Sequence, residues 1–186
     1  CEAVGVQMHS QAILPMVQSL MAQAGLALSQ CDAIAFGSGP GSFTGVRTAC
    51  GIAQGLAFGL NKPIVPVVTL EAMAHACHGI SGASDVLVVL DARMGEVYWA
   101  QYRFADGWVV IAEPVLSAPG AVESVGNVRA CGNGLQAYAS AFSSKTFVQN
   151  ALSQVQPHAT QIVQLAEVAF KQGHWLAVKA QRIENG

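Results

Sequence analysis

The chain has 186 residues, of which 52% are hydrophobic and only 11% are charged, and its formal net charge is −2. This length suffices for one domain with a sizeable core or for two small lobes. The nine Lys and Arg residues are scattered singly, which argues against a protein that grips nucleic acid unaided. So little charge favours an apolar patch that is left for a partner.

The five cysteines lie far apart, and their spacing matches neither a zinc site nor a disulfide framework. Reduced thiols in a cytoplasmic protein are therefore expected. No apolar run approaches the roughly 18 residues of a membrane span, so no membrane association is expected.

The first predicted helix spans residues 10–24, after a short remnant strand within residues 1–7. Its apolar residues recur along one face, which is typical of an amphipathic helix. Gly25 is suited to end it. The apolar face comprises Ile13, Leu14, Val17, Leu20, Met21 and Ala24.

A glycine-rich turn at residues 37–45 follows a short buried strand at 32–36 and leads into a helix at 46–60. Small residues recur every four positions along that helix, so another helix can approach closely. The turn lacks the lysine of a phosphate-binding P-loop. Two interpretations remain open: a tight turn that packs the helix on the sheet, or an anion or nucleotide contact at the helix N-terminus.

Strands are predicted at residues 62–68, 85–90 and 96–103, and the second of these is apolar throughout, as a central strand should be. Thr69 is a plausible N-cap of a helix through residue 76. Residues 108–112 form the hairpin partner of 96–103.

A further strand at residues 128–131, a weak helix to 142 and a last helix at 160–172 complete the pattern. Strands that alternate with helices, together with one hairpin, predict an α/β fold with a mixed sheet.

Candidate chemistry is sparse. Asp91 and Glu96 follow the central strand and could act as a carboxylate pair or as Mg²⁺ ligands; the alternative is an Asp91 contact to Arg93 that holds a turn. His75 and His78 have one-turn spacing but no third metal ligand. No catalytic residue and no metal ligand is assigned.

Two motifs resemble the bacterial TsaB (YeaZ) family of tRNA threonylcarbamoyladenosine biosynthesis proteins. They are Gly39-Pro-Gly-Ser-Phe-Thr-Gly-Val-Arg47 and Asp91-Ala-Arg-Met-Gly-Glu-Val-Tyr-Trp-Ala100. The resemblance covers most of residues 8–104 and is weak from about residue 113. At both ends the chain departs from the family pattern, as though residues were missing, so a nucleotide contact from the family's first turn cannot be placed.

The resemblance implies an actin-like, hexokinase-like ATPase (ribonuclease H-like) fold, with mixed sheets flanked by helices in two lobes. We expect an N-terminal lobe at residues 1–104 and a smaller C-terminal lobe at residues 105–186.

The resemblance also implies a non-catalytic scaffold or activator of a sister enzyme, TsaD, which transfers the threonylcarbamoyl group to the adenosine beside the anticodon. We expect a TsaE-like ATPase to complete the assembly, the chain alone to form a homodimer, and tRNA to be contacted only through the complex. No cofactor is assigned to the chain itself; ATP or ADP with Mg²⁺ could bind in the assembled complex. The alternatives are an autonomous ATPase or peptidase-like enzyme of the same fold, and a plain dimeric structural module.

Two sets of site residues follow. The partner interface is expected on the two helices, at Ile13, Leu14, Val17, Leu20, Met21, Ala49, Ile52, Ala53 and Leu56. The anion or nucleotide contact, if the second interpretation of the turn holds, involves Gly39, Gly41, Ser42 and Asp91.

Overall fold

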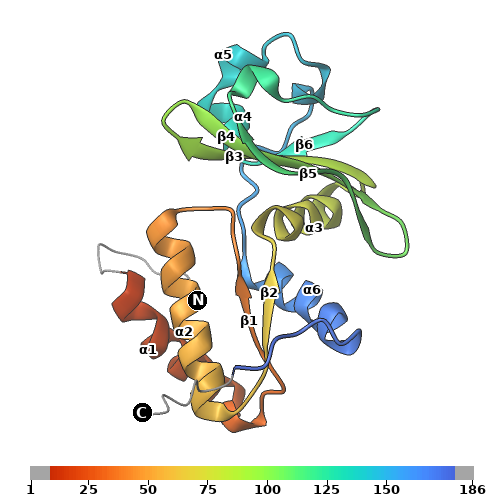
Figure 1. The fold of residues 1–186 in the computed structure, drawn as a ribbon. Coiled ribbons are helices and arrows are strands. Elements are labelled where there is room, and N and C mark those ends of the chain that lie inside the picture. Colours follow the sequence, from red (N-terminus) through yellow and green to blue (C-terminus); the bar gives the residue numbers. More distant parts are fainter. Residues whose placement is uncertain (1–8, 179–186) are drawn as a thin grey trace, which may run out of the picture.

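Strand β3 (Asp85–Arg93) lies inside a four-stranded sheet in the computed structural model, which describes residues 9–178 (Figure 1). The strand order is β5-β4-β3-β6. Strand β3 runs antiparallel to β4 (Glu96–Phe104) and parallel to β6 (Arg129–Cys131), so the sheet is mixed as predicted. The edge strand β5 (Trp108–Ser117) pairs with β4 and completes the predicted hairpin.

Helices cover both faces of this sheet, which explains why β3 is apolar throughout its centre. Helix α3 (Thr69–Ser81) packs on one face, and the short helices α4 (Gly134–Ala137) and α5 (Ala139–Phe142) cover the other (Figure 1). The buried residues beneath α3 include Leu70, Met73, Cys77, Val86, Val88 and Tyr102. Those beneath α4 and α5 include Leu87, Val89, Val97, Leu135 and Phe142.

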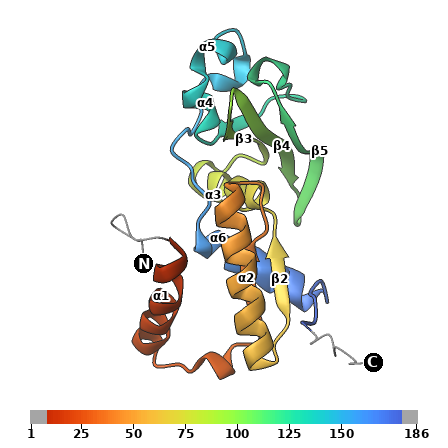
Figure 2. The ribbon, with the colours of Figure 1, turned by 60° about the vertical axis from the view of Figure 1, so that its left-hand side comes forward.

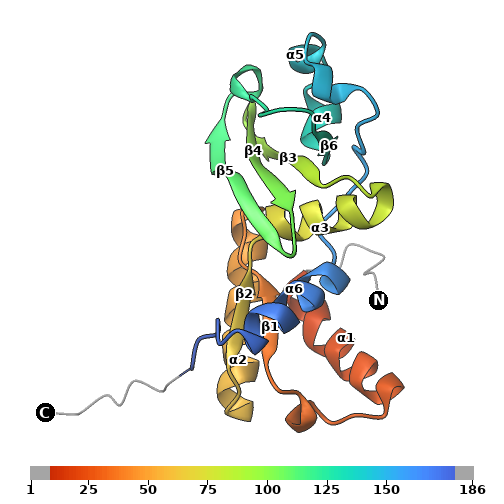
Figure 3. The ribbon, with the colours of Figure 1, turned by 90° about the vertical axis from the view of Figure 1, so that its right-hand side faces the viewer.

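A second, two-stranded sheet forms the other lobe. Strands β1 (Ile34–Gly37) and β2 (Ile64–Val67) run parallel, and helices α2 (Phe43–Leu60) and α6 (Ala159–Lys171) lie on opposite faces of the pair (Figure 3). Helix α3 lies between the two lobes in all three views. Because α6 returns to this lobe after β6, the chain crosses between the lobes twice.

Helix α1 (His9–Ala24) stands to one side, separated from α2 in Figure 2. Gly25 follows it with a φ of +66°, as expected for a glycine that ends a helix. The remaining short elements within residues 9–178 are three 3₁₀ turns: η1 (Leu28–Gln30), η2 (Pro119–Ala121) and η3 (Thr146–Val148).

Two local predictions need correction. Thr69 is the first residue of α3 rather than its N-cap, which is Val68, and no side chain caps that helix. Helix α3 also continues to Ser81, five residues beyond the predicted end at 76, and ends at Gly82, which has a φ of +69°.

The sheets also divide the chain differently from the expected lobes at 1–104 and 105–186. Strands β4 and β5 pair through Phe104 and Trp108, so the strands on either side of that boundary share one sheet. The strand expected within residues 1–7 and the tail from residue 179 lie outside the described residues.

Within residues 9–178, none of the helices combines the length and the apolar character that a membrane span needs. Cys31, Cys50, Cys77 and Cys131 carry free thiols, and the last two are buried in the core.

Candidate functional site

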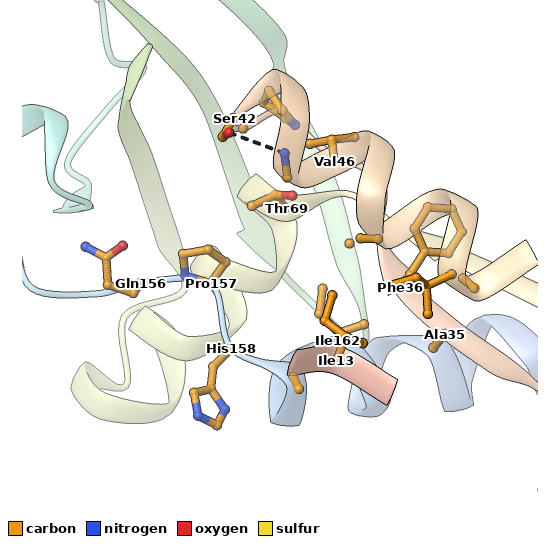
Figure 4. A pocket seen from close by; sticks show the side chains of 18 of the residues that line it. Ile13, Ala35, Phe36, Ser42, Val46, Thr69, Gln156, Pro157, His158 and Ile162 are labelled. Carbon is orange, nitrogen blue, oxygen red and sulfur yellow. Dashed lines mark hydrogen bonds between the residues drawn. The ribbon is translucent and has the colours of Figure 1, made fainter. Parts of the chain in front are cut away.

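A cavity of about 1130 Å³ opens where the lobe of β1 and β2 meets the end of β3 (Figure 4). Most of its lining is apolar and comes from α1, α2, β1 and α6. The cavity brings together most of the residues that the sequence singled out: Ile13, Val17, Gly41, Ser42, Ala49, Ile52, Ala53, Leu56 and Asp91. Leu14, Leu20, Met21 and Gly39 are not part of its lining.

The glycine turn holds the start of α2 against the ends of the two parallel strands. The Ser42 hydroxyl caps α2 by accepting the Gly45 N–H at 3.3 Å. Gly39 has a φ of +100°, a conformation that glycine adopts readily. Its carbonyl oxygen accepts the Thr69 N–H at 2.7 Å, which ties the turn to the start of α3. This geometry fits the tight-turn interpretation and leaves the first turn of α2 facing the cavity.

Asp91, near the end of β3, also lines the cavity, and groups of its own chain bind its carboxylate. Oδ1 accepts the Arg93 N–H at 2.8 Å and the Tyr138 hydroxyl at 3.0 Å. The Arg93 guanidinium lies 3.5 Å from Oδ2 but is largely exposed, so that ion pair is weak. The Asp91 N–H donates to Oδ1 of Asn133 at 3.0 Å. Glu96 is exposed and does not line the cavity, so the geometry resembles the turn-holding alternative more than a carboxylate pair.

The two helices that were expected to form the interface both contribute to the cavity lining, and they stand apart from each other in Figure 2. On α1, Leu14 and Leu20 are 46% and 55% exposed. On α2, Ala53 is only 4% exposed and packs within the chain. The other expected interface residues are half-buried: Ile13, Val17, Met21, Ala49, Ile52 and Leu56.

The outward face of α2 is unusually open. A Cβ placed at Gly51, Gly55 or Gly59 would meet no atom within 4 Å in the described part of the chain. Phe58 on the same face is 56% exposed, and the exposed Phe43 ring at its start stacks under the Arg47 guanidinium at 3.9 Å. The small residues predicted from their spacing therefore leave a shallow strip on the surface of the helix.

The two histidines of α3 have structural partners. Nδ1 of His75 accepts the Trp108 Nε1–H at 3.3 Å, and Nδ1 of His78 lies 2.9 Å from the carbonyl oxygen of Ala83. Burial lowers the pKa of His75, which favours the neutral ring that this acceptor role requires. Within residues 9–178, no three His, Cys, Asp or Glu side chains are grouped so that they could hold a metal ion.

Thr69 is one of the polar residues of the cavity lining that are not among the predicted site residues. Its hydroxyl lies at the carboxyl ends of β1 and β2, where ligands of parallel sheets bind. The signal was present in the sequence, since Thr69 directly follows the strand that precedes α3.

Comparison with known proteins identifies the family. The family model described as "TsaD: tRNA N6-adenosine threonylcarbamoyltransferase" matches residues 4–180. The chain is 40% identical to the tRNA threonylcarbamoyladenosine biosynthesis protein TsaB of Haemophilus influenzae, over 91% of this chain and 75% of that protein. It is 54% identical to TsaB of Escherichia coli over a shorter stretch, 51% of this chain and 41% of that protein.

Solved structures agree with this match. YeaZ from Pseudomonas aeruginosa superposes with a TM-score of 0.81 at 35% identity, covering 93% of this chain and 83% of that one. The mixed four-stranded sheet, the parallel strand pair and the flanking helices fit the actin-like fold that the resemblance implies. The chain therefore belongs to the TsaB (YeaZ) family, within the wider group that the TsaD model describes.

Proposed function

We propose that the chain takes part in forming threonylcarbamoyladenosine on tRNA, as a non-catalytic subunit that pairs with a TsaD-like transferase. The observation that carries this proposal is the 40% identity to a TsaB protein over 91% of the chain. The relative is named for this biosynthesis, and the partner follows from the family resemblance.

The surface of α1 and α2 supports a pairing role. Leu14 and Leu20 on α1 and Phe58 on α2 expose large apolar side chains, and the glycine strip of α2 admits a second helix at close range. The half-buried apolar walls between the two helices remain accessible through the cavity. Partner helices that contact both the exposed faces of α1 and α2 and the cavity walls between them would cover the expected interface residues, apart from the buried Ala53.

Apolar contact would dominate the affinity of such a pair. A stable interface buries about 1,200–2,000 Å² in total. At ~25 cal/mol per Å² of apolar area, this contribution far exceeds the ~0–1 kcal/mol of an exposed ion pair. The same surface would let the chain form a homodimer that competes with the TsaD pair. A TsaE-like ATPase would join the complex in the cytoplasm, and tRNA would be contacted through the assembly.

Reconstitution tests the proposal. The chain is mixed with a TsaD-like transferase, the TsaE-like ATPase, the threonylcarbamoyl-adenylate donor and tRNA, and the modified nucleoside is quantified by mass spectrometry. We expect modification to require the chain, while the chain with donor and tRNA alone gives none. Equal modification with and without the chain would refute the proposal.

The rival function is an autonomous ATPase or peptidase-like enzyme, and one structural relative is described as similar to a peptidase, YeaZ from Pseudomonas aeruginosa. This rival predicts turnover by the isolated chain that Asp91→Ala removes. The carboxylate of Asp91 is already bound by Tyr138 and Arg93, which favours the subunit role.

A further inference from the structure

The turn between β3 and β4 has an unusual backbone for the residues that form it. Arg93 pairs with Glu96, so the loop consists of Met94 and Gly95 alone. The φ angles of Arg93, Met94 and Gly95 are +67°, +53° and +82°. Positive φ at both loop residues is typical of a type I′ turn, which strongly favours asparagine, aspartate or glycine. Other residues adopt this left-handed conformation only at a cost in free energy.

The rest of the described chain follows that preference. Its other non-glycine residues with positive φ are Asn61, Asp106 and Asn150. Arg93 and Met94 are therefore the two exceptions among the described residues, and they are adjacent. Backbone strain of this kind is concentrated at functional sites, where the surrounding structure maintains it.

The two side chains contribute little to the packing of the chain itself. Met94 is 98% exposed, and the side chain of Arg93 is 87% exposed. The ion pair of Arg93 with Asp91 is weak for the same reason. The backbone, in contrast, is held in place, because the Asp91 carboxylate accepts the Arg93 N–H at 2.8 Å and is itself bound by Tyr138. The turn thus presents a thioether and a guanidinium to the outside on a fixed support.

The position of the turn indicates which partner it meets. Arg93 lines the same cavity as Ile13 of α1 and Ile52 of α2, which belong to the expected interface. A subunit that covers those helices therefore lies within reach of the turn. Methionine and arginine are both enriched in protein–protein interfaces. The exposed Glu96 beside Arg93 offsets its charge, so the turn is poorly suited to the phosphates of RNA.

We propose that the β3–β4 turn is a second contact with the TsaD-like subunit, in which Met94 enters an apolar hollow of the partner and Arg93 meets a carboxylate. This inference rests on the proposed function and extends the pairing surface beyond α1 and α2. It also accounts for the strain, because the complex regains in binding what the isolated chain loses in stability.

Met94→Asn separates these two effects, since asparagine tolerates the left-handed conformation and lacks the apolar side chain. We expect the melting temperature of the isolated chain, followed by circular dichroism, to stay the same or rise. The dissociation constant for the TsaD-like subunit, measured by calorimetric titration, should rise at least about tenfold. Arg93→Asn should also weaken pairing and make it less sensitive to salt. The control, Asp106→Asn, alters the exposed β4–β5 turn outside the cavity lining and should change neither quantity.

Unchanged affinity in Met94→Asn would overturn the proposal. A fall in its melting temperature would do so as well, because the side chain would then stabilise the chain itself. If the isolated chain binds tRNA and Met94→Asn abolishes that binding, the turn contacts RNA instead of the subunit. If the unaltered chain does not bind the TsaD-like subunit, the proposed pairing is wrong too, whereas pairing that persists in Met94→Asn refutes only the role of the turn.

Discussion

Two glycines set the position of Asp91 from a distance. Gly132 has a φ of +106°, and a Cβ there would overlap the carbonyl oxygen of Val89 in β3. A Cβ at Gly134 would lie 3.0 Å from the same oxygen. Asn133, between them, accepts the Asp91 N–H. The close approach of this turn to β3 therefore positions the side-chain amide of Asn133. That amide in turn holds Asp91 at the cavity.

Gly132→Ala should destabilise the chain. The left-handed conformation costs about 1–2 kcal/mol for alanine, and the overlap with β3 adds a similar amount. A total loss of about 3 kcal/mol corresponds to a fall in melting temperature of roughly 6–12 °C for a chain of this size, measurable by circular dichroism. The control is Gly79→Ala, in an open position of α3, which should be neutral or slightly stabilising. A Gly132→Ala variant with the same melting temperature as the unaltered chain would contradict this account.

Single residues were predictable where the signal is local. The capping role of glycine at residue 25 and the turn before α2 follow from backbone preferences alone. The contact of Thr69 with the glycine turn was not predictable in this way, because Gly37 and Gly39 lie about thirty positions earlier in the chain. Only the pairing of β1 with β2 brings them together.

At the scale of elements, a hydrogen bond that requires a neutral His75 ring joins α3 to the β4–β5 hairpin. The Nδ1 atom of His75 accepts the Trp108 N–H, which a protonated ring cannot do. Burial lowers the pKa of His75 from 6.5; the nearby His78 lowers it further, and a hydrogen bond with Gln164 partly opposes the shift. As the pH falls below about 6.5, the unfolded chain takes up this proton more readily than the folded chain. The stabilisation is therefore complete above that pH and is lost as the pH falls through the folded-state pKa.

In His75→Gln, the side-chain oxygen can still accept the hydrogen bond from Trp108. We expect the melting temperature of this variant to fall less between pH 7.5 and pH 5 than that of the unaltered chain. Thermal melts at half-unit pH steps measure this slope. His174→Gln, at an exposed histidine after α6, serves as the control and should keep the slope of the unaltered chain. Identical slopes for the His75 variant and the unaltered chain would show that the bond is not linked to protonation.

Element boundaries were predicted well where a single hydrophobic periodicity dominates the local sequence. They were predicted poorly where pairing with another strand decides where an element ends. Helix α1 follows its apolar stripe within one residue of the prediction. Strand β5 continues to Ser117, beyond the predicted end at 112 and through Pro114. A proline is tolerated there because β5 is an edge strand and its register with β4 is interrupted near this point.

At the scale of the whole molecule, the sequence predicted an α/β fold with a mixed sheet but not the two separate sheets. Local patterns do not reveal that β1 and β2 form a sheet separate from that of β3, or that α6 returns to cover it. The resemblance supplied the two-lobed architecture. The cavity at the junction depends on that return, because α6 forms one of its walls.

The open face of α2 allows a test of pairing that does not disturb the core. Gly55→Arg places a charged side chain where no described atom lies within 4 Å, so the isolated chain should fold normally and gain about 0.5–1 kcal/mol from the loss of a helix glycine. In a complex, the same charge would be buried against an apolar partner, and we expect affinity for the TsaD-like subunit to fall at least about tenfold. Calorimetric titration measures this affinity, and sedimentation velocity measures the parallel loss of self-association.

The matched control is Gly79→Arg, the same change at an exposed position of α3, away from the α1 and α2 surface. It should leave both kinds of association unchanged. If Gly55→Arg binds the partner as tightly as the control does, the outward face of α2 is not in the interface. The pairing surface would then have to lie elsewhere, although the family assignment would stand.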